Sequence, residues 1–189
     1  MSRAYRIRVK ESLARDLSAS DEICSDLELL EILPADQMGE LLRRELTQRG
    51  YEEKEGKMIR ETGTITVTVD PKTGEVTVKA EAKDSVKLDA EREDWGYDDV
   101  GPAEDRIKAR LADQLKQDLE RKADQQQSRL QTQATEKLEG VMNDLRKELG
   151  QAVNRVTAEA LKIKAASLGA IKEMTEDPEA GTLTIKVEV

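Results

Sequence analysis

The densest group of residues that could do chemistry is an acidic run around two aromatic side chains. It consists of Asp89, Glu91, Glu93, Asp94, Trp95, Tyr97, Asp98 and Asp99. Carboxylate oxygens suit Ca²⁺ or Mg²⁺, but the spacing does not match the EF-hand loop. Acidic runs of this kind are usually solvated. We therefore predict no metal site and no cofactor here.

Trp95 and Tyr97 are the more informative pair, because aromatic residues make up only 2% of the chain. Trp and Tyr are enriched among the residues that contribute most to protein–protein binding. We therefore predict a partner-binding role for both. The more common alternative is that they cover the end of a sheet or the base of a helix.

The chain lacks several residues and motifs that catalysis commonly requires. There is no histidine, so a Ser-His-Asp triad and a histidine-activated cysteine are both excluded. Cys24 lies in an apolar strand pattern, and we expect it to be buried and inert. The glycine-rich phosphate-binding motifs are absent as well. We predict no catalytic residue and a protein that is not an enzyme.

The net charge, the hydropathy and the cysteine count indicate which kinds of partner and which cellular location to expect. The net charge is -9, whereas nucleic-acid binding needs dense Lys and Arg. No apolar run approaches the roughly 18 residues that cross a bilayer, and the first residues lack an apolar signal region. A single cysteine fits a reducing compartment. We expect protein partners, no nucleic acid, no membrane insertion and a cytoplasmic location.

The elements that must position these residues begin with short strands. Residues 4–10 alternate between apolar and charged types, which predicts a strand, and residues 13–21 read as a polar connection. The first half of residues 23–33 predicts a second strand. Its Asp26 and Glu28 would then lie opposite Arg6 and Arg8.

A short helix and two hairpins follow. Pro34 favours a helix start and Gly50 a helix end, and residues 51–61 suggest a weak strand or a hairpin around Gly56. A clear hairpin spans residues 65–80, with a turn at residues 70–74, and could extend to residue 90. Residues 177–188 match residues 70–81 at six of twelve positions. This similarity indicates either a duplicated module or, more commonly, the shared rules of hairpins.

A helical pattern with a thin apolar stripe runs from about residue 103 to residue 167. The stripe consists of Ile107, Leu111, Leu115, Leu119, Ala123, Leu130, Ala134, Leu138, Val141, Leu145, Leu149, Ala152, Val156, Ala160 and Ile163. A helix this polar needs a partner helix. The helix could fold back as a helical hairpin, or it could stay long and pair with a second chain as a coiled coil. We favour a helical hairpin or a bent helix in an oligomer. We therefore add Leu130, Leu138, Leu145, Leu149 and Val156 to the predicted partner-binding residues.

These patterns predict an α+β fold. A small antiparallel sheet with β-hairpins and one short helix would lead through a long polar helix, or helical hairpin, to a C-terminal hairpin. The expected regions are an N-terminal sheet region at 1–90, an acidic linker at 91–102, a helical arm at 103–168 and a C-terminal β-hairpin at 169–189. We expect this last hairpin to join a sheet.

Three stretches of the chain resemble a bacterial family. They are SRAYRIRVKESL at residues 2–13, LELLEILP at 27–34, and the ending LGAI at 168–171 with GTLTIKVEV at 181–189. Together they resemble the accessory proteins of the FtsH ternary system. The resemblance implies gene neighbourhoods with AAA+ ATPases and a von Willebrand A protein, and it implies no catalytic residue.

The expected function is that of a non-catalytic interaction module linked to an AAA+ ATPase system. Its partners would be the AAA+ ATPase or the von Willebrand A protein. The first alternative is a stalk-like coiled-coil protein that forms a homo-oligomer through residues 103–167. An unrecognised enzyme is the last alternative.

Overall fold

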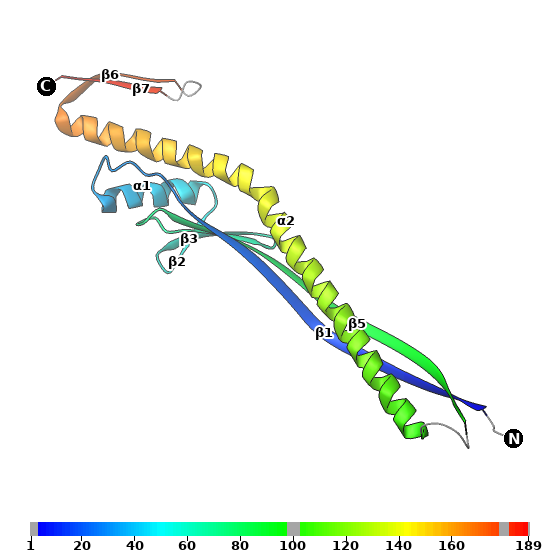
Figure 1. Ribbon diagram of the computed structural model, residues 1–189. Helices are drawn as coiled ribbons and strands as arrows, with labels where there is room; N and C mark the ends of the chain where they lie inside the picture. Colours follow the sequence, from blue (N-terminus) through cyan, green and yellow to red (C-terminus); the bar gives the residue numbers. More distant parts are fainter. Residues whose placement is uncertain (1–3, 98–102, 178–181, 189) are drawn as a thin grey trace. The chain divides into compact units, whose positions relative to one another are not determined.

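The computed structural model describes residues 4–97, 103–177 and 182–188. These residues form two helices and seven strands, which confirms the predicted α+β class (Figure 1). In chain order they are β1 (Ala4–Asp26), α1 (Ala35–Gln48), β2 (Glu52–Lys54), β3 (Lys57–Thr62), β4 (Ile65–Val69), β5 (Glu75–Tyr97), α2 (Glu104–Leu168), β6 (Ala170–Asp177) and β7 (Thr182–Glu188).

Five strands form one sheet in the order β1-β5-β4-β3-β2. The predicted hairpin over residues 65–80 is confirmed, because β4 and β5 pair antiparallel with Val67 opposite Val78. In the turn between them, the Asp70 side chain accepts a hydrogen bond from the backbone N–H of Lys72 at 2.9 Å, and Gly74 has a φ of +81°. Asp and Gly therefore act as their turn preferences predict.

Strand β1 corrects the prediction for residues 13–28. It is one strand of 23 residues, without a connection at 13–21 and without a second strand that folds back on the first. The burial pattern explains this, because Leu17 and Ala19 are buried while their polar neighbours point outward. A strand with one covered face tolerates polar residues on the other face.

Strand β5 corrects the prediction of an acidic linker. Residues 91–97 are the last part of this strand rather than a loop, and residues 98–102 lie outside the described part of the chain. The acidic side chains fit in a strand because β1 supplies cations beside them. Arg8 bonds to Glu91 at 2.7 Å and to Glu93 at 2.5 Å, so Asp26 and Glu28 are not its partners.

Helix α1 has the predicted limits. Pro34 is its N-cap residue, and Gly50, directly after the C-cap, has the positive φ of +82° that favours glycine. Its apolar face is buried, with Leu42 and Leu46 fully covered. The expected hairpin around Gly56 is also confirmed, as the turn between β2 and β3.

The chain divides into two compact units. Unit 1 consists of Met1–Ser20 and Glu81–Thr135, and unit 2 consists of Asp21–Ala80 and Glu136–Val189. Unit 1 contains two small apolar clusters, one of them around Ile7, Ile107 and Leu111. Unit 2 contains the larger core, in which α1, strands β3 to β5 and the second half of α2 pack together.

Helix α2 is continuous over 65 residues, so of the two forms that we favoured the helical hairpin is wrong. No proline interrupts it, and an isolated glycine costs only about 1 kcal/mol relative to Ala. Most of the predicted apolar stripe is buried. The exceptions are Val141, which is half-buried, and Ile163, which is 44% exposed; Met142 and Ala165 are buried near them.

The C-terminal strands β6 and β7 form an antiparallel two-stranded sheet. Ile171 pairs with Val187 and Met174 with Ile185, with a bulge after Ile171. Among the described residues this hairpin does not continue the five-stranded sheet. Residues 178–181, part of the stretch that matches residues 70–81 in sequence, lie outside the described residues.

Candidate functional site

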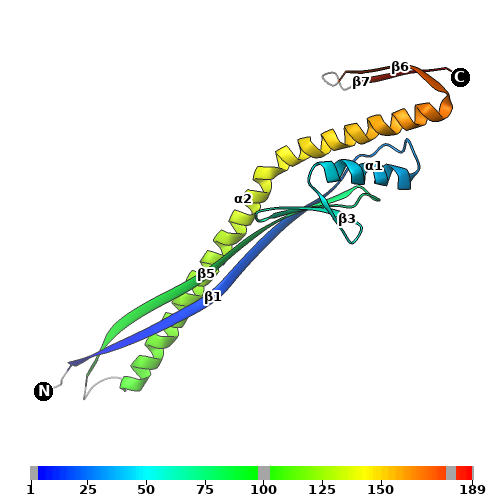
Figure 2. The same cartoon turned by 180° about the vertical axis from the view of Figure 1, so that it is seen from behind.

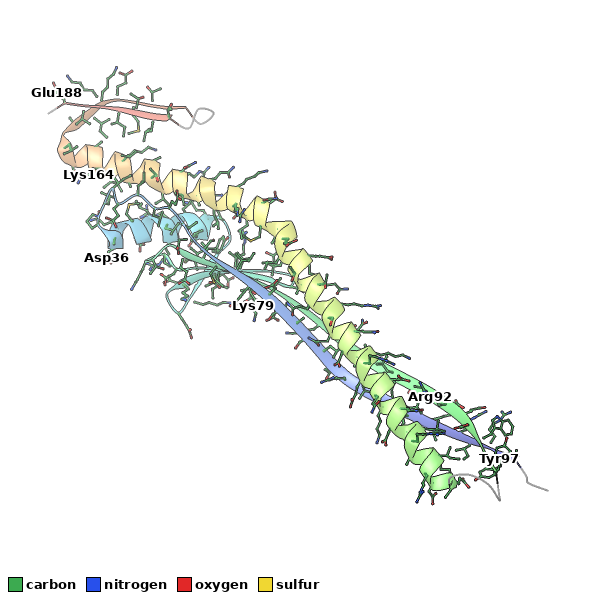
Figure 3. The ribbon with its side chains drawn as sticks, viewed as in Figure 1. Asp36, Lys79, Arg92, Tyr97, Lys164 and Glu188 are labelled. Carbon is green, nitrogen blue, oxygen red and sulfur yellow. The ribbon has the colours of Figure 1, made fainter. Side chains whose placement is uncertain are left out.

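The aromatic pair predicted from the sequence lies at the end of β5 in unit 1. Trp95 and Tyr97 are 53% and 54% exposed, whereas Gly96 between them is buried. Because side chains alternate along a strand, Trp95 and Tyr97 point to the same face. Figure 3 places Tyr97 at the end of the strand, beyond Arg92. The two rings therefore offer an exposed aromatic surface, which we call the aromatic end.

Residues of β1 hold the aromatic end in place. The guanidinium carbon of Arg6 lies 5.3 Å from the centre of the Trp95 ring, within cation–π range. The Tyr5 ring covers Gly96 so closely that a Cβ atom at residue 96 would lie 2.5 Å from its Cζ. Tyr5 also packs against the apolar cluster around Ile7. Only glycine fits beneath the ring without a shift.

Three carboxylates of the acidic run, those of Glu91, Glu93 and Asp94, are engaged in ion pairs. Glu91 and Glu93 contact cations of β1, which include Lys10 at 3.0 Å and Arg6 at 3.4 Å. Asp94 accepts a bond from Arg110 at 2.5 Å. Such exposed pairs stabilise a fold little, but they offset the negative charge beside Trp95. Asp98 and Asp99 lie outside the described residues, and the described residues contain no group of three or more side chains that could hold a metal ion.

The five helical residues proposed as partner contacts lie in the interior. Leu130, Leu138, Leu145, Leu149 and Val156 are each at most 5% exposed. Leu130 packs with Leu17 and Ala82 in unit 1, and the other four belong to the core of unit 2. Their covering comes from strands and α1 of the same chain, so the stripe does not need a second helix. They present almost no surface to a partner in this structure.

Cys24 is exposed, so the expectation of a buried thiol is wrong. Its neighbour Ile23 packs against the core, and alternation along β1 turns the Cys24 side chain the other way. The Sγ atom lies 3.7 Å from the Thr77 Oγ1 atom. The apolar character of the surrounding residues indicated a strand, but it did not indicate which residues of that strand face inward.

A polar cluster in unit 2 was missed by the sequence analysis. Arg60 of β3 donates two hydrogen bonds to the Glu148 carboxylate of α2, at 2.6 and 2.7 Å. Arg49 donates to the backbone oxygen of Glu148 at 3.2 Å. The Arg60 guanidinium also lies 4.5 Å from the centre of the Tyr51 ring. Because 88 residues separate Arg60 from Glu148, no local pattern could have found this contact.

The electrostatics of this cluster favour a structural role. Burial raises the pKa of Tyr51 to about 12, an effect that nearby Arg60 partly opposes. The hydrogen bond to Glu148 raises the pKa of Arg60. At neutral pH the phenol is therefore protonated and the guanidinium charged, so neither group can act as a general base. The cluster fastens β3 to α2 within unit 2.

These features define an α+β protein with an exposed aromatic surface at the end of β5. The chain belongs to the family of FtsH ternary system domain X5, whose model matches residues 1–189. This confirms the resemblance noted from the sequence. Membership implies association with other components of that system.

No curated protein and no solved structure matches this chain. In the described residues, neither helix combines the length and the apolar character that crossing a bilayer demands.

Proposed function

We propose that this chain is a non-catalytic accessory module that binds a protein component of its system through the aromatic end. The observation that carries this proposal is the exposure of Trp95 and Tyr97 on one face of β5. Large aromatic side chains that remain half-exposed at a fixed position are typical of interaction hot spots. The partners expected from the family resemblance are the AAA+ ATPase and the von Willebrand A protein.

The way the aromatic end is held also supports binding by contact. Arg6 lies beside Trp95, and Tyr5 fills the space over Gly96, so the backbone between the two aromatic residues has support from β1. A preorganised surface loses less conformational entropy on binding. Arg6 adds a guanidinium group, and Arg is also common in hot spots.

A stalk-like homo-oligomer is less well supported. That alternative depended on an apolar stripe along residues 103–167 that lacks a partner. The stripe is mostly covered by other elements of the same chain, as Leu111 in unit 1 and Leu138 in unit 2 illustrate. The non-enzymatic assignment draws support from the absence of histidine and from the protonated state of Tyr51 at neutral pH.

The single tryptophan makes a direct test possible. The full chain labelled with 5-fluorotryptophan carries one fluorine reporter, at Trp95. We expect its ¹⁹F signal to shift when the purified AAA+ ATPase or the von Willebrand A protein is added, because the ring loses water contact. Tyr97→Ala should weaken binding of the same partner by about tenfold, as expected for a hot-spot residue.

Leu30→Ala is the matched control, because Leu30 is 61% exposed but belongs to unit 2. It should leave the affinity within about twofold. An unchanged ¹⁹F signal in the presence of a partner that binds the chain would refute the proposal. Equal affinities of the wild type and the Tyr97→Ala variant would do so as well.

A further inference from the structure

The outer edge of β1 has no strand beside it. In the five-stranded sheet β1 is the terminal strand, and β5 is its one neighbour among the described strands. Figure 2 shows these two strands side by side. An edge strand presents a row of unpaired backbone N–H and C=O groups. Such a row selects an extended strand as its partner, because an extended backbone offers acceptors and donors at the same spacing.

The even-numbered residues of β1 turn their backbone groups toward this outer edge. Along a strand, the backbone groups of successive residues point to opposite sides. Just beyond the end of β1, the backbone N–H of Leu27 donates to the backbone oxygen of Gly74 at 2.8 Å. The odd-numbered residues of β1 therefore face β5, and the even-numbered residues face outward.

Two glutamine side chains of α2 cover part of the edge. Gln127 donates to the backbone oxygen of Ser18 at 2.6 Å, and Gln131 donates to that of Ser20 at 3.1 Å. Both acceptors have even numbers, in agreement with the alternation. Within the described part of the chain, no side chain covers the backbone oxygens of residues 10–16 in this way. The open stretch of the edge therefore lies before Ser18.

Residues 10–16 of this open stretch, with the sequence KESLARD, are complementary to themselves in the reverse direction. With Leu13 as the centre, each residue on one side corresponds to a residue on the other. The corresponding pairs are Lys10 with Asp16, Glu11 with Arg15, and Ser12 with Ala14. An antiparallel strand of the same sequence therefore meets every charge with the opposite charge, which stabilises neighbouring strands. Moving the centre to residue 12 or 14 separates both charged pairs.

The backbone of the edge fits the same register. With Leu13 at a twofold axis, even-numbered residues of one copy lie opposite even-numbered residues of the other. The outward-facing backbone groups of the two edges then meet and exchange hydrogen bonds. The Glu11–Arg15 pairs and the two Leu13 side chains occupy the non-hydrogen-bonded positions, where side chains approach most closely.

The four charged side chains of this segment are able to pair with a second copy. Glu11 and Asp16 have no cation at ion-pair distance among the described residues. Arg15 has one contact, to Asp124 at 3.7 Å, and both of these side chains are more than half exposed. Lys10 is 69% exposed and keeps donors free beside its bond to β5.

We infer that two copies of this chain pair antiparallel through residues 10–16 of β1, which joins their sheets across a twofold axis. Lys10 pairs with the partner's Asp16, and Glu11 pairs with the partner's Arg15. This contact uses neither the aromatic end nor the apolar stripe of α2. The inference and the proposed function can therefore fail independently.

Charge reversal in the full chain tests the register. Sedimentation equilibrium of the wild type should show a reversible monomer–dimer equilibrium. Glu11→Arg and Arg15→Glu should each weaken the dimer at least about tenfold, because each places like charges opposite one another twice. An equimolar mixture of these two variants should form a heterodimer, since every pair is then of opposite charge. Glu28→Arg makes the same charge change at an exposed residue outside the segment and should leave the dimer unchanged.

Proline tests the use of the backbone edge. Ser12→Pro removes an outward-facing N–H, and an edge strand tolerates proline on this side. The variant should keep the circular dichroism spectrum of the wild type and lose the dimer, whereas Ser12→Ala should keep both. In the wild type, the amide protons of Ser12 and Ala14 should exchange more slowly at concentrations that favour the dimer.

Several results would overturn the inference. A wild type that stays monomeric at all concentrations would do so, and binding of a foreign strand to that monomer would give the edge a different occupant. A dimer that survives Ser12→Pro would place the contact elsewhere. Failure of the two charge variants to associate when mixed would exclude the register, and this experiment stays decisive if Ser12→Pro does not fold.

Discussion

Replacing Tyr51 by Phe tests the electrostatics of the polar cluster in unit 2. The Tyr51 ring is 2% exposed, and its hydroxyl has no hydrogen-bond partner among the described residues. Burial raises its pKa from 10.0 to about 12. The folded state therefore holds the phenolic proton more tightly than the unfolded state does.

The sign of the pH dependence follows from this difference. Below pH 10 the phenol of Tyr51 is protonated in both the folded and the unfolded state. The free energy of unfolding then keeps its full contribution from this group. Between pH 10 and about pH 12 only the unfolded chain loses the proton, so the free energy of unfolding falls as pH rises. The rise of the pKa from 10.0 to about 12 corresponds to about 3 kcal/mol at most.

The assay is urea unfolding of the wild type and of Tyr51→Phe, followed by circular dichroism from pH 8 to pH 11.5. At pH 8 the variant should be within about 1 kcal/mol of the wild type, because the lost hydroxyl makes no hydrogen bond. Above pH 10 the wild type should lose stability faster than the variant does. The lysines and other shared groups affect the pH dependence of both proteins alike, so their contributions cancel when the two profiles are compared.

Tyr97→Phe is the matched control, since Tyr97 is 54% exposed. Its free energy of unfolding should follow the pH profile of the wild type. The reasoning would be refuted if Tyr51→Phe also gave that same profile. Such a result would mean that burial does not hold the Tyr51 proton.

Two further predictions concern packing in unit 2. Gly39→Ala should lower the free energy of unfolding by about 1 kcal/mol, because the new Cβ would lie 2.9 Å from the backbone oxygen of Pro71 and the clash outweighs the gain in helix propensity. Gly140→Ala, with open space around it, should instead stabilise by up to about 1 kcal/mol. Leu138→Ala should cost about 2 to 5 kcal/mol as a core residue, whereas Leu161→Ala, at an exposed position, should cost less than about 0.5 kcal/mol. Urea unfolding measures all four variants, and a cost for Leu138→Ala as small as that for Leu161→Ala would contradict the assignment of Leu138 to the core.

Local signals in the sequence were sufficient for much of the fold. The turn at residues 70–74, the limits of α1 and the helical pattern from residue 103 were all predictable, because each depends on residues close together in the chain. The exposure of Cys24 was not predicted, since an apolar neighbourhood does not specify which residues of a strand face inward.

Long-range pairing decided the remaining features of the sheet. The prediction that Arg6 and Arg8 pair with carboxylates was correct in kind, but Asp26 and Glu28 were the wrong partners. The observed partners, Glu91 and Glu93, lie more than eighty residues further along the chain. Only the alignment of β1 with β5 brings these side chains together.

The sequence by itself determined that this chain has an apolar stripe on a long helix, an aromatic pair in an acidic run, and no histidine for catalysis. The tertiary structure decided what covers the stripe, and therefore that Leu138 lies in the interior. It also decided that the Trp95 side chain on β5 stays exposed. The position of β1 at the edge of its sheet was decided there as well. The physical reason is that the periodicity of a helix specifies which face is apolar, whereas the packing of distant elements determines what lies against that face.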